Sequence, residues 1–226
     1  MKKDPDHPIS VFFLYLGRDA NLRPTMNIRK DIFVSSFAIL RHMNNSQSKF
    51  MLLPIWLYIT GWLFFLYLFI SLLHFSAEDS SNAILSGMYF IDFGVHEASH
   101  MITFFLPAIF VAAAGSIGEM SFTLLLLIAT LKAKSYFAAV FAGLWVMLGF
   151  MSAGRYMADA RAQSLPLIGP GETVQHDWHY VFSQLGWLNA DTFIGGAIQA
   201  VGIIIGAGSL LFGLYLILLK LSTPKV

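Results

Sequence analysis

The stretch MLLPIWLYITGWLFFLYLFISLL, residues 51–73, contains no charged side chain. A helix that crosses a bilayer needs about 20 predominantly apolar residues, and this stretch is long enough. Four aromatic residues that tolerate a membrane interface lie within it: Trp56, Tyr58, Trp62 and Tyr67. We therefore predict a membrane-spanning helix here.

The composition of the whole chain agrees with this prediction. Of the 226 residues, 57% are hydrophobic and only 12% are charged, and the mean hydropathy is +0.67. Soluble domains have about 25% charged residues, so the chain falls in the membrane class. Cysteine is absent, which excludes disulfides, cysteine nucleophiles and thiolate metal ligands. Any metal ion must be held by histidine, aspartate or glutamate.

Apolar stretches continue beyond residue 73, and Pro107 breaks the longest of them, because proline disfavours helical geometry in the residue before it. In the last stretch, Gly202 and Gly206 have the small-xxx-small spacing of close helix contacts. The fold class that we predict is an all-α, polytopic transmembrane helical bundle of about five spans (four to six). After the first, the expected spans are residues 86–106, 108–131, 136–153 and 192–219.

The chain divides by composition into residues 1–50, a basic and cytoplasmic or interfacial segment, and residues 51–226, a membrane helical domain. A polar loop is expected at 162–190, with an amphipathic helix at 172–188. Eight of the 14 basic residues precede residue 50, which predicts a cytoplasmic N-terminus that can contact anionic lipid. Nucleic-acid binding is not expected, because aromatic and basic residues are not interleaved. A short chain without a targeting sequence suits a bacterial plasma membrane.

Five spans conflict with this orientation. They place the lysines that follow the third and fifth spans outside, against the positive-inside tendency. These residues are Lys132, Lys134, Lys220 and Lys225. A re-entrant stretch at about 86–118, or a sixth span, would remove the conflict.

The sharpest chemical signature is His96-Glu97-Ala98-Ser99-His100. Residues four apart lie on one face of a helix, so both imidazoles can bind one metal ion. In an HExxH motif the glutamate accepts a proton from the metal-bound water. We therefore expect Zn²⁺ on His96 and His100, with Glu97 as the catalytic general base. The alternative is a pair of neutral histidines hydrogen-bonded to neighbouring helices, with Glu97 protonated or paired.

A catalytic zinc ion usually has three protein ligands and one open position. The third ligand is expected in Gln175-His176-Asp177-Trp178-His179. We favour His176 as the metal ligand, with Asp177 and His179 as alternates or as residues that orient the ligands. A loop with solvated histidines is the alternative.

Two further acidic residues lie in apolar stretches. Asp92 is four residues before His96 and is expected either to bond a ligating imidazole or to cap the helix. Glu119 is expected to pair with Arg155 or Arg161. Both roles are structural.

Residues 94–107, GVHEASHMITFFLP, resemble membrane-embedded zinc metalloproteases of the site-2 protease type, which carry HExxH on a transmembrane helix. The resemblance is limited to this helix. It implies that His96 and His100 bind zinc, that Glu97 is the general base, and that the activity is cleavage within the membrane. That family takes its third ligand from an aspartate in an Asn/Leu-Asp-Gly context, which this sequence does not contain.

The function that we expect is therefore zinc-dependent hydrolysis of peptide bonds in the membrane, with the lipid bilayer and a membrane protein or peptide substrate as partners. Two other readings stay open. Histidine boxes also occur in membrane lipid hydrolases and di-iron desaturases, and a closed four-ligand site would fit a non-enzymatic subunit of a membrane assembly. Metal analysis would separate a zinc hydrolase, with one zinc ion per chain, from a di-iron desaturase, with two iron ions. Glu97→Gln would separate an enzyme from a scaffold.

Overall fold

The computed structural model describes residues 54–75, 82–167 and 175–222, all within one compact unit, Met51–Val226. These residues form α-helices and one 3-10 helix, and the described part of the chain contains no β-strand. In chain order the elements are α4 (Ile55–His74), α5 (Ala83–Thr103), α6 (Ala108–Lys132), α7 (Tyr136–Ala158), α8 (Asp177–Leu185), the 3-10 helix η1 (Leu188–Ala190) and α9 (Asp191–Ser222).

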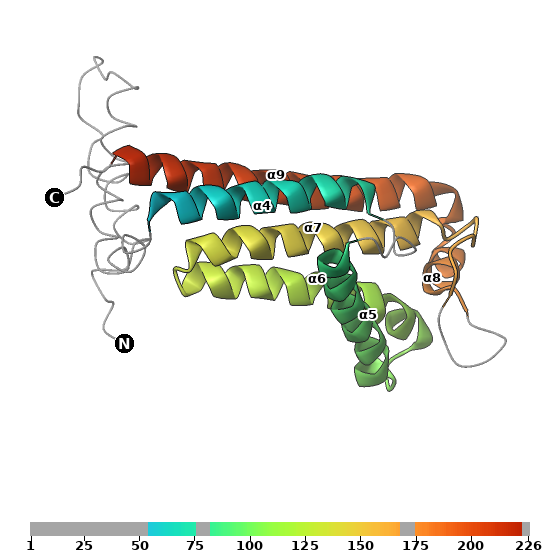
Figure 1. The fold of residues 1–226 in the computed structure, drawn as a ribbon. Helices are drawn as coiled ribbons and strands as arrows, with labels where there is room; N and C mark the ends of the chain where they lie inside the picture. The colour runs from blue at the N-terminus through green and yellow to red at the C-terminus, as the bar shows by residue number, and fades with distance from the viewer. Residues whose placement is uncertain (1–53, 76–81, 168–174, 223–226) are drawn as a thin grey trace, which may run out of the picture. The chain divides into compact units, whose positions relative to one another are not determined.

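The prediction of an all-α membrane bundle is confirmed. Four segments are long and apolar enough to cross a membrane: α4, α6, α7 and η1 together with α9. The helix at the expected span 86–106 is α5, which is not among these four and lies across the long helices at a steep angle (Figure 1). Pro54 precedes α4 and Pro107 precedes α6. Proline lacks a backbone N–H, and this costs nothing at the start of a helix, where the N–H has no partner within the helix. Pro107 also separates α5 from α6, as expected.

Both ends of α5 lie in the same half of the bundle. The Nδ2 of Asn82, which caps the start of α5, is 3.4 Å from the hydroxyl of Tyr67 in the second half of α4. At the other end of α5, His100 contacts Val111 in the first turn of α6. This arrangement corresponds to the re-entrant alternative considered for residues 86–118.

Helices α7 and α9 pack antiparallel through glycines. An added Cβ at Gly202 would lie 2.7 Å from the Cβ of Phe150, and one at Gly206 would lie 3.1 Å from the Cβ of Met147. Closer to the start of α9, Gly195 lies against the backbone of Gly154. The expected close contact at Gly202 and Gly206 is therefore confirmed, and α7, the most buried of the spans, forms the centre of the bundle.

The directions of the long helices define two ends. Helix α4 runs antiparallel to α9, since Trp62 Nε1 donates to the carbonyl of Leu210 at 2.9 Å while Tyr58, one turn earlier, lies under Nζ of Lys220 at 4.4 Å. Helices α6 and α7 form a tight hairpin at Ala133–Ser135. One end, the lysine end, therefore holds the start of α4, the α6–α7 turn and the end of α9, with Lys132, Lys134 and Lys220. The opposite end, the histidine end, holds the end of α4, the starts of α6 and α9, the end of α7, and α8 (Figure 1).

Helix α8 covers the histidine end. It is amphipathic, as expected for this region, and it buries Trp178, Val181 and Phe182 against neighbouring helices. The indole of Trp178 donates to the hydroxyl of Ser116 in α6 at 2.9 Å. Gly186 ends α8 with a φ of 70°, a conformation that glycine adopts at low cost. The helix is thus fixed over α6 and α7 with its first residue, Asp177, beside them.

Candidate metal centre

Helix α5 presents a polar stripe to α6. Asp92, His96 and His100 follow one another at intervals of four residues and lie on one helix face. Opposite them, α6 has a glycine. An added Cβ at Gly115 would overlap the Nε2 of His96 and would lie 2.6 Å from the Nε2 of His100. Glycine at this position therefore leaves room for both imidazoles.

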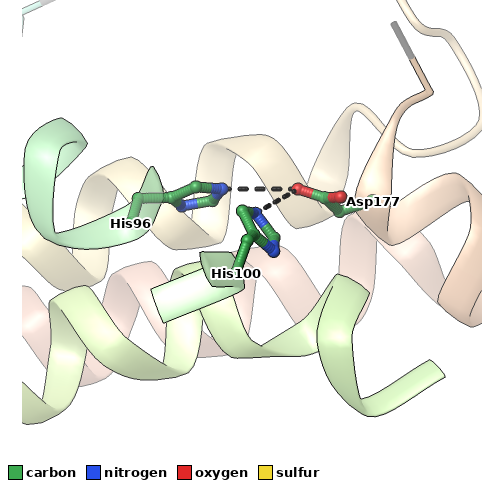
Figure 2. A group of neighbouring side chains, drawn as sticks. All are labelled: His96, His100 and Asp177. Carbon is green, nitrogen blue, oxygen red and sulfur yellow. Dashed lines mark hydrogen bonds and ion pairs between the residues drawn. The ribbon is translucent and has the colours of Figure 1, made fainter. Parts of the chain in front are cut away.

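Three ligand atoms from two distant parts of the chain come together here (Figure 2). Oδ2 of Asp177 lies 3.3 Å from Nε2 of His96 and 3.3 Å from Nε2 of His100. These three residues form the only group of three or more metal-ligating side chains found in the described ranges. Their side chains are 11%, 21% and 21% exposed for His96, His100 and Asp177, so the group is partly accessible.

The second nitrogen of each imidazole faces an acceptor. Nδ1 of His100 lies 2.8 Å from the carbonyl oxygen of Val111, which can only accept, so Nδ1 carries the proton. Nδ1 of His96 lies 3.5 Å from Oε2 of Glu119. A neutral imidazole protonated at Nδ1 has its free electron pair on Nε2. When Nδ1 carries the proton, the Nε2 electron pair of each ring faces the carboxylate oxygen of Asp177.

Two of the three distances between ligand atoms agree with a tetrahedral ion. Ligand atoms about 2.0–2.1 Å from a tetrahedral zinc ion are about 3.3–3.4 Å from one another. The two measured distances to Asp177 Oδ2 are 3.3 Å. His96, His100 and Asp177 thus form a group that could hold a metal ion.

Tyr156 in α7 fixes the third member of the group. Its hydroxyl accepts from the backbone N–H of Asp177 at 3.0 Å and lies 3.3 Å from Oδ2 of the same residue. Tyr156 therefore holds both the backbone and the carboxylate of Asp177 beside the two imidazoles.

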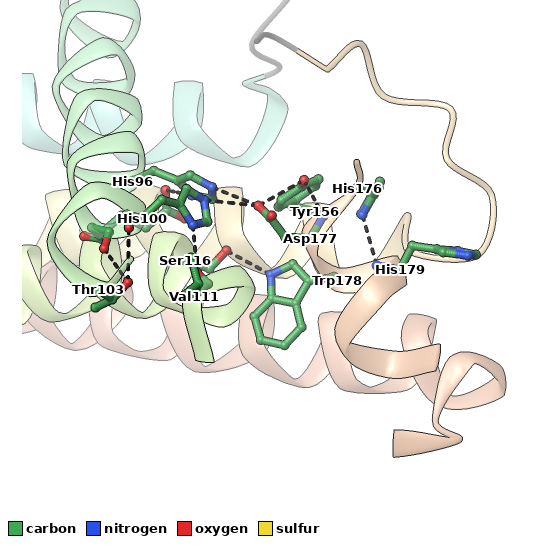
Figure 3. Close-up of polar contacts among 12 residues, drawn as sticks. His96, His100, Thr103, Val111, Ser116, Tyr156, His176, Asp177, Trp178 and His179 are labelled. Carbon is green, nitrogen blue, oxygen red and sulfur yellow. Dashed lines mark hydrogen bonds and ion pairs between the residues drawn. The ribbon is translucent and has the colours of Figure 1, made fainter. Parts of the chain in front are cut away.

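His176, the favoured third ligand, is not part of the group (Figure 3). It caps the start of α8, where its Nδ1 accepts from the backbone N–H of His179 at 3.2 Å. Its Nε2 lies 3.5 Å from Oδ2 of Asp159. Of the two alternates, Asp177 joins the group, whereas Nδ1 of His179 lies 2.8 Å from the carbonyl oxygen of Ala160.

Asp159 is the anchor for His176. It accepts hydrogen bonds from the backbone N–H groups of Ser164 and Leu165 and from the Ser164 hydroxyl. Burial raises the pKa of Asp159, but these hydrogen bonds outweigh burial and hold the pKa below its usual value. An ionised Asp159 therefore holds the turn after α7 and faces the imidazole that caps α8.

Glu97, the expected general base, is exposed on α5 one residue after His96. Glu97 is therefore next to a candidate ligand in the chain, with its own side chain exposed.

The structural partners of the other charged residues differ from expectation. Asp92 accepts from the indole of Trp145 at 2.9 Å, so it neither contacts a candidate ligand nor caps α5. The expected pairing of Glu119 with an arginine is wrong, because Glu119 faces His96. Arg161 instead pairs with Asp191 at 3.3 Å, and Arg155 donates to the carbonyl of Phe75.

Two contributors to this site were not recognised from the sequence, Gly115 and Tyr156. No local motif marks either of them, since both act through tertiary contacts. The sequence did contain a local signal for Asp177, because an acidic residue is favoured in the first turn of a helix. The preceding residue, His176, is then the helix cap, whose side chain turns back onto the helix. No protein-family model, no curated protein and no solved structure matches this chain.

Proposed function

We propose that this protein is a membrane-embedded, zinc-dependent metalloprotease that hydrolyses peptide bonds with a metal-activated water. In this proposal His96, His100 and Asp177 bind the zinc ion and Glu97 is the general base. The membrane is a bacterial plasma membrane, and the N-terminus is cytoplasmic.

One observation carries the proposal: two imidazole nitrogens and one carboxylate oxygen, from α5 and α8, converge within 4.8 Å of one another. Nδ1 of His100 is committed to a carbonyl oxygen, and Nδ1 of His96 faces a carboxylate. Their Nε2 atoms both face the Oδ2 of Asp177. Two imidazolium ions at this site would repel each other, because the ring centroids are only 4.8 Å apart. A single divalent cation satisfies all three donors at once.

The donor types favour zinc. Two imidazole nitrogens and one carboxylate oxygen are among the common ligand sets of catalytic zinc, and three protein ligands leave a fourth position for water. No fourth protein donor joins this group among the residues that the structure describes. A closed structural site would need one, so the ligand number favours catalysis over scaffolding.

The protein's side chains have distinct tasks in the reaction. A bound zinc ion would lower the pKa of a water molecule and polarise the scissile carbonyl. Glu97 would take a proton from the water, whose oxygen bonds to the carbonyl carbon, and would give that proton to the amine nitrogen as the carbon–nitrogen bond breaks. Tyr156 and the cap of α8 hold Asp177 in place.

Glu97→Gln tests the catalytic part of this proposal against a structural metal site. The purified variant should keep one zinc ion per chain and should lose turnover of a quenched fluorescent peptide library in detergent micelles. Asp177→Asn is the comparison variant, and it should lose both. Equal turnover of wild type and Glu97→Gln would refute the enzymatic proposal, and turnover of lipid esters in place of peptides would refute proteolysis.

A further inference from the structure

We propose that the end of α5 and the turn into α6 form an anchor immersed in lipid, where acyl chains meet the headgroups at the histidine end of the bundle. The turn comprises residues 104–107, Phe-Phe-Leu-Pro. This inference goes beyond the proposed function, because it rests on the apolar surface around the turn and requires neither zinc nor catalysis.

A patch of large apolar side chains surrounds this turn, where the end of α5 projects beyond α6 (Figure 1). The most exposed member, Phe104, is 77% exposed. No aspartate, glutamate, lysine or arginine lies between Glu97 and Glu119. An apolar surface of this kind marks contact with a membrane or with another protein. The tip patch consists of Met101, Ile102, Phe104, Phe105, Leu106 and Phe110.

The length of α6 places the tip patch at a membrane boundary. Lys132, the last residue of α6, is exposed, and a lysine at a helix end extends its charge to the aqueous interface. From there the 25 residues of α6 extend about 37 Å at 1.5 Å per residue. The hydrocarbon core is about 30 Å thick, or about 40–45 Å with the headgroups. The start of α6 and the turn before it therefore reach the opposite boundary.

The two turns of α6 differ in the way that this placement requires. The α6–α7 turn, residues 133–135, includes the exposed Lys134 and follows Lys132 directly. The α5–α6 turn has two phenylalanines and a leucine in the corresponding place. On α5, the exposed Glu97 is four residues before Met101, about 6 Å along the helix axis. A charged side chain so close to the tip patch fits the boundary of the bilayer, where water and acyl chains are both within reach.

Two features of the tip patch fit fluid lipid better than a protein partner. Ile102 and Phe104 are two residues apart, so at about 100° per residue they point to nearly opposite sides of the tip. A protein docked on one side would leave the other side in water, whereas acyl chains surround both. The patch also continues along α6, where Phe110, Ile117 and Leu125 are exposed at spacings of seven and eight residues. That face belongs to a helix long and apolar enough to cross a membrane.

Polar groups near the turn have partners within the protein, as immersion in lipid requires. The backbone N–H of Leu106 donates to the carbonyl of Thr103 at 2.8 Å, and Pro107 has no N–H to satisfy. The hydroxyl of Thr103 donates to the carbonyl of Ser99 at 2.7 Å. The hydroxyl of Ser99 in turn donates to the carbonyl of Val95 at 2.7 Å. The tip can therefore enter lipid without leaving these donors unpaired.

Spin labelling tests the immersion directly, because the chain has no native cysteine. Three exposed positions are compared: Phe105→Cys in the α5–α6 turn, Leu125→Cys on the outer face of α6, and Ser135→Cys in the α6–α7 turn. Each full-length variant carries a nitroxide and is reconstituted in phosphatidylcholine vesicles. Collisions with O₂, which concentrates among acyl chains, are compared with collisions with the water-soluble complex nickel–EDDA. We expect O₂ collisions to exceed nickel collisions at the first two positions, and the reverse at the third.

Two results overturn the proposal. Nickel collisions that exceed O₂ collisions at Phe105→Cys would place the turn in water, and few collisions with either reagent would mean that a second copy or another protein covers the tip. Ile102→Cys, on the helix before the turn, gives the same comparison if Phe105→Cys does not fold. Zinc content measured on the same vesicles separates the two proposals. A lipid-exposed label on zinc-free protein refutes the proposed function alone, and a water-exposed label on zinc-loaded protein refutes the anchor alone.

Discussion

The chain contains two histidine pairs of similar helical spacing that have different structural roles. His96 and His100 point their Nε2 atoms at one carboxylate oxygen, at 3.3 Å each. His176 and His179, three residues apart, do not converge: one caps α8 and faces Asp159, and the other contacts Ala160. The spacing alone does not determine whether a histidine pair can bind a metal ion.

The two pairs differ in what the Nδ1 atom of the imidazole contacts. For His100 the Nδ1 atom donates to a carbonyl oxygen, which leaves Nε2 as a free electron pair. For His176 the Nδ1 atom is itself the acceptor, because it caps a backbone N–H, so Nε2 carries the proton that faces Asp159. A capping histidine is thereby in the wrong tautomer to offer Nε2 to a metal ion.

The largest effect on zinc binding is expected when substitutions of the two adjacent residues Asp177 and His176 are compared. Asp177→Asn removes the anionic ligand and should abolish stoichiometric zinc binding and activity. His176→Asn keeps a side chain that can cap α8 and should keep the zinc ion. Metal content by mass spectrometry decides between them. Zinc loss in His176→Asn with zinc retained in Asp177→Asn would show that the sequence-based choice of ligand was right.

Glu97→Gln is expected to lower turnover by about 10²–10⁴-fold, the usual contribution of a general acid–base, at unchanged zinc content. Glutamine has nearly the same shape but cannot accept the proton of the water. Steady-state cleavage of the peptide library measures the effect. Ser99→Ala, on the same helix turn and hydrogen-bonded only within α5, is the control and should turn over normally.

Gly115→Ala should lower zinc affinity by about 10–100-fold, as changes next to metal ligands commonly do. The added methyl group would overlap the imidazole of His96 and displace Nε2. Competition with a fluorescent zinc chelator gives the affinity. Gly87→Ala is the matched control, since a Cβ there meets no atom within 4 Å. Equal affinity of the two variants would contradict the geometry of the site.

Glu119→Ala should weaken zinc binding by about 10-fold, because Glu119 faces Nδ1 of His96 and fixes the orientation of that ring. Glu119→Gln retains an acceptor oxygen and should restore most of the affinity. The same chelator competition measures both. A loss of affinity that glutamine does not restore would mean that Glu119 acts through its charge or its packing.

The smallest effect is expected for His179→Ala. This change removes the contact with the carbonyl of Ala160 and should lower the free energy of unfolding by about 1 kcal/mol, with zinc content unchanged. Thermal unfolding in detergent and metal analysis measure the two quantities. Loss of zinc here would place the second histidine pair in the metal site.

Most of the fold could be predicted because each spanning helix is encoded locally by a long apolar stretch. The expected spans 108–131 and 192–219 correspond to α6 (Ala108–Lys132) and α9 (Asp191–Ser222). Helix α5 was harder, since its length resembles that of a span while its polar stripe lets it lie across the bundle. Its orientation depends on contacts with α6 and α7, which no local pattern records.

The candidate site could be predicted only in part. His96 and His100 follow from helical spacing, whereas the choice between His176 and Asp177 depends on the residue at which α8 begins. Because His176 is the cap and Asp177 the first helical residue, their side chains leave the chain in different directions. A shift of one residue in the start of this helix would exchange their roles.

The metal content of the detergent-purified wild-type protein tests the central claim most directly. If His96, His100 and Asp177 converge on a cation, mass spectrometry will find one zinc ion per chain, which chelation removes and added zinc restores. Protein that retains full folded structure with no bound metal, or with two iron ions per chain, would contradict the account.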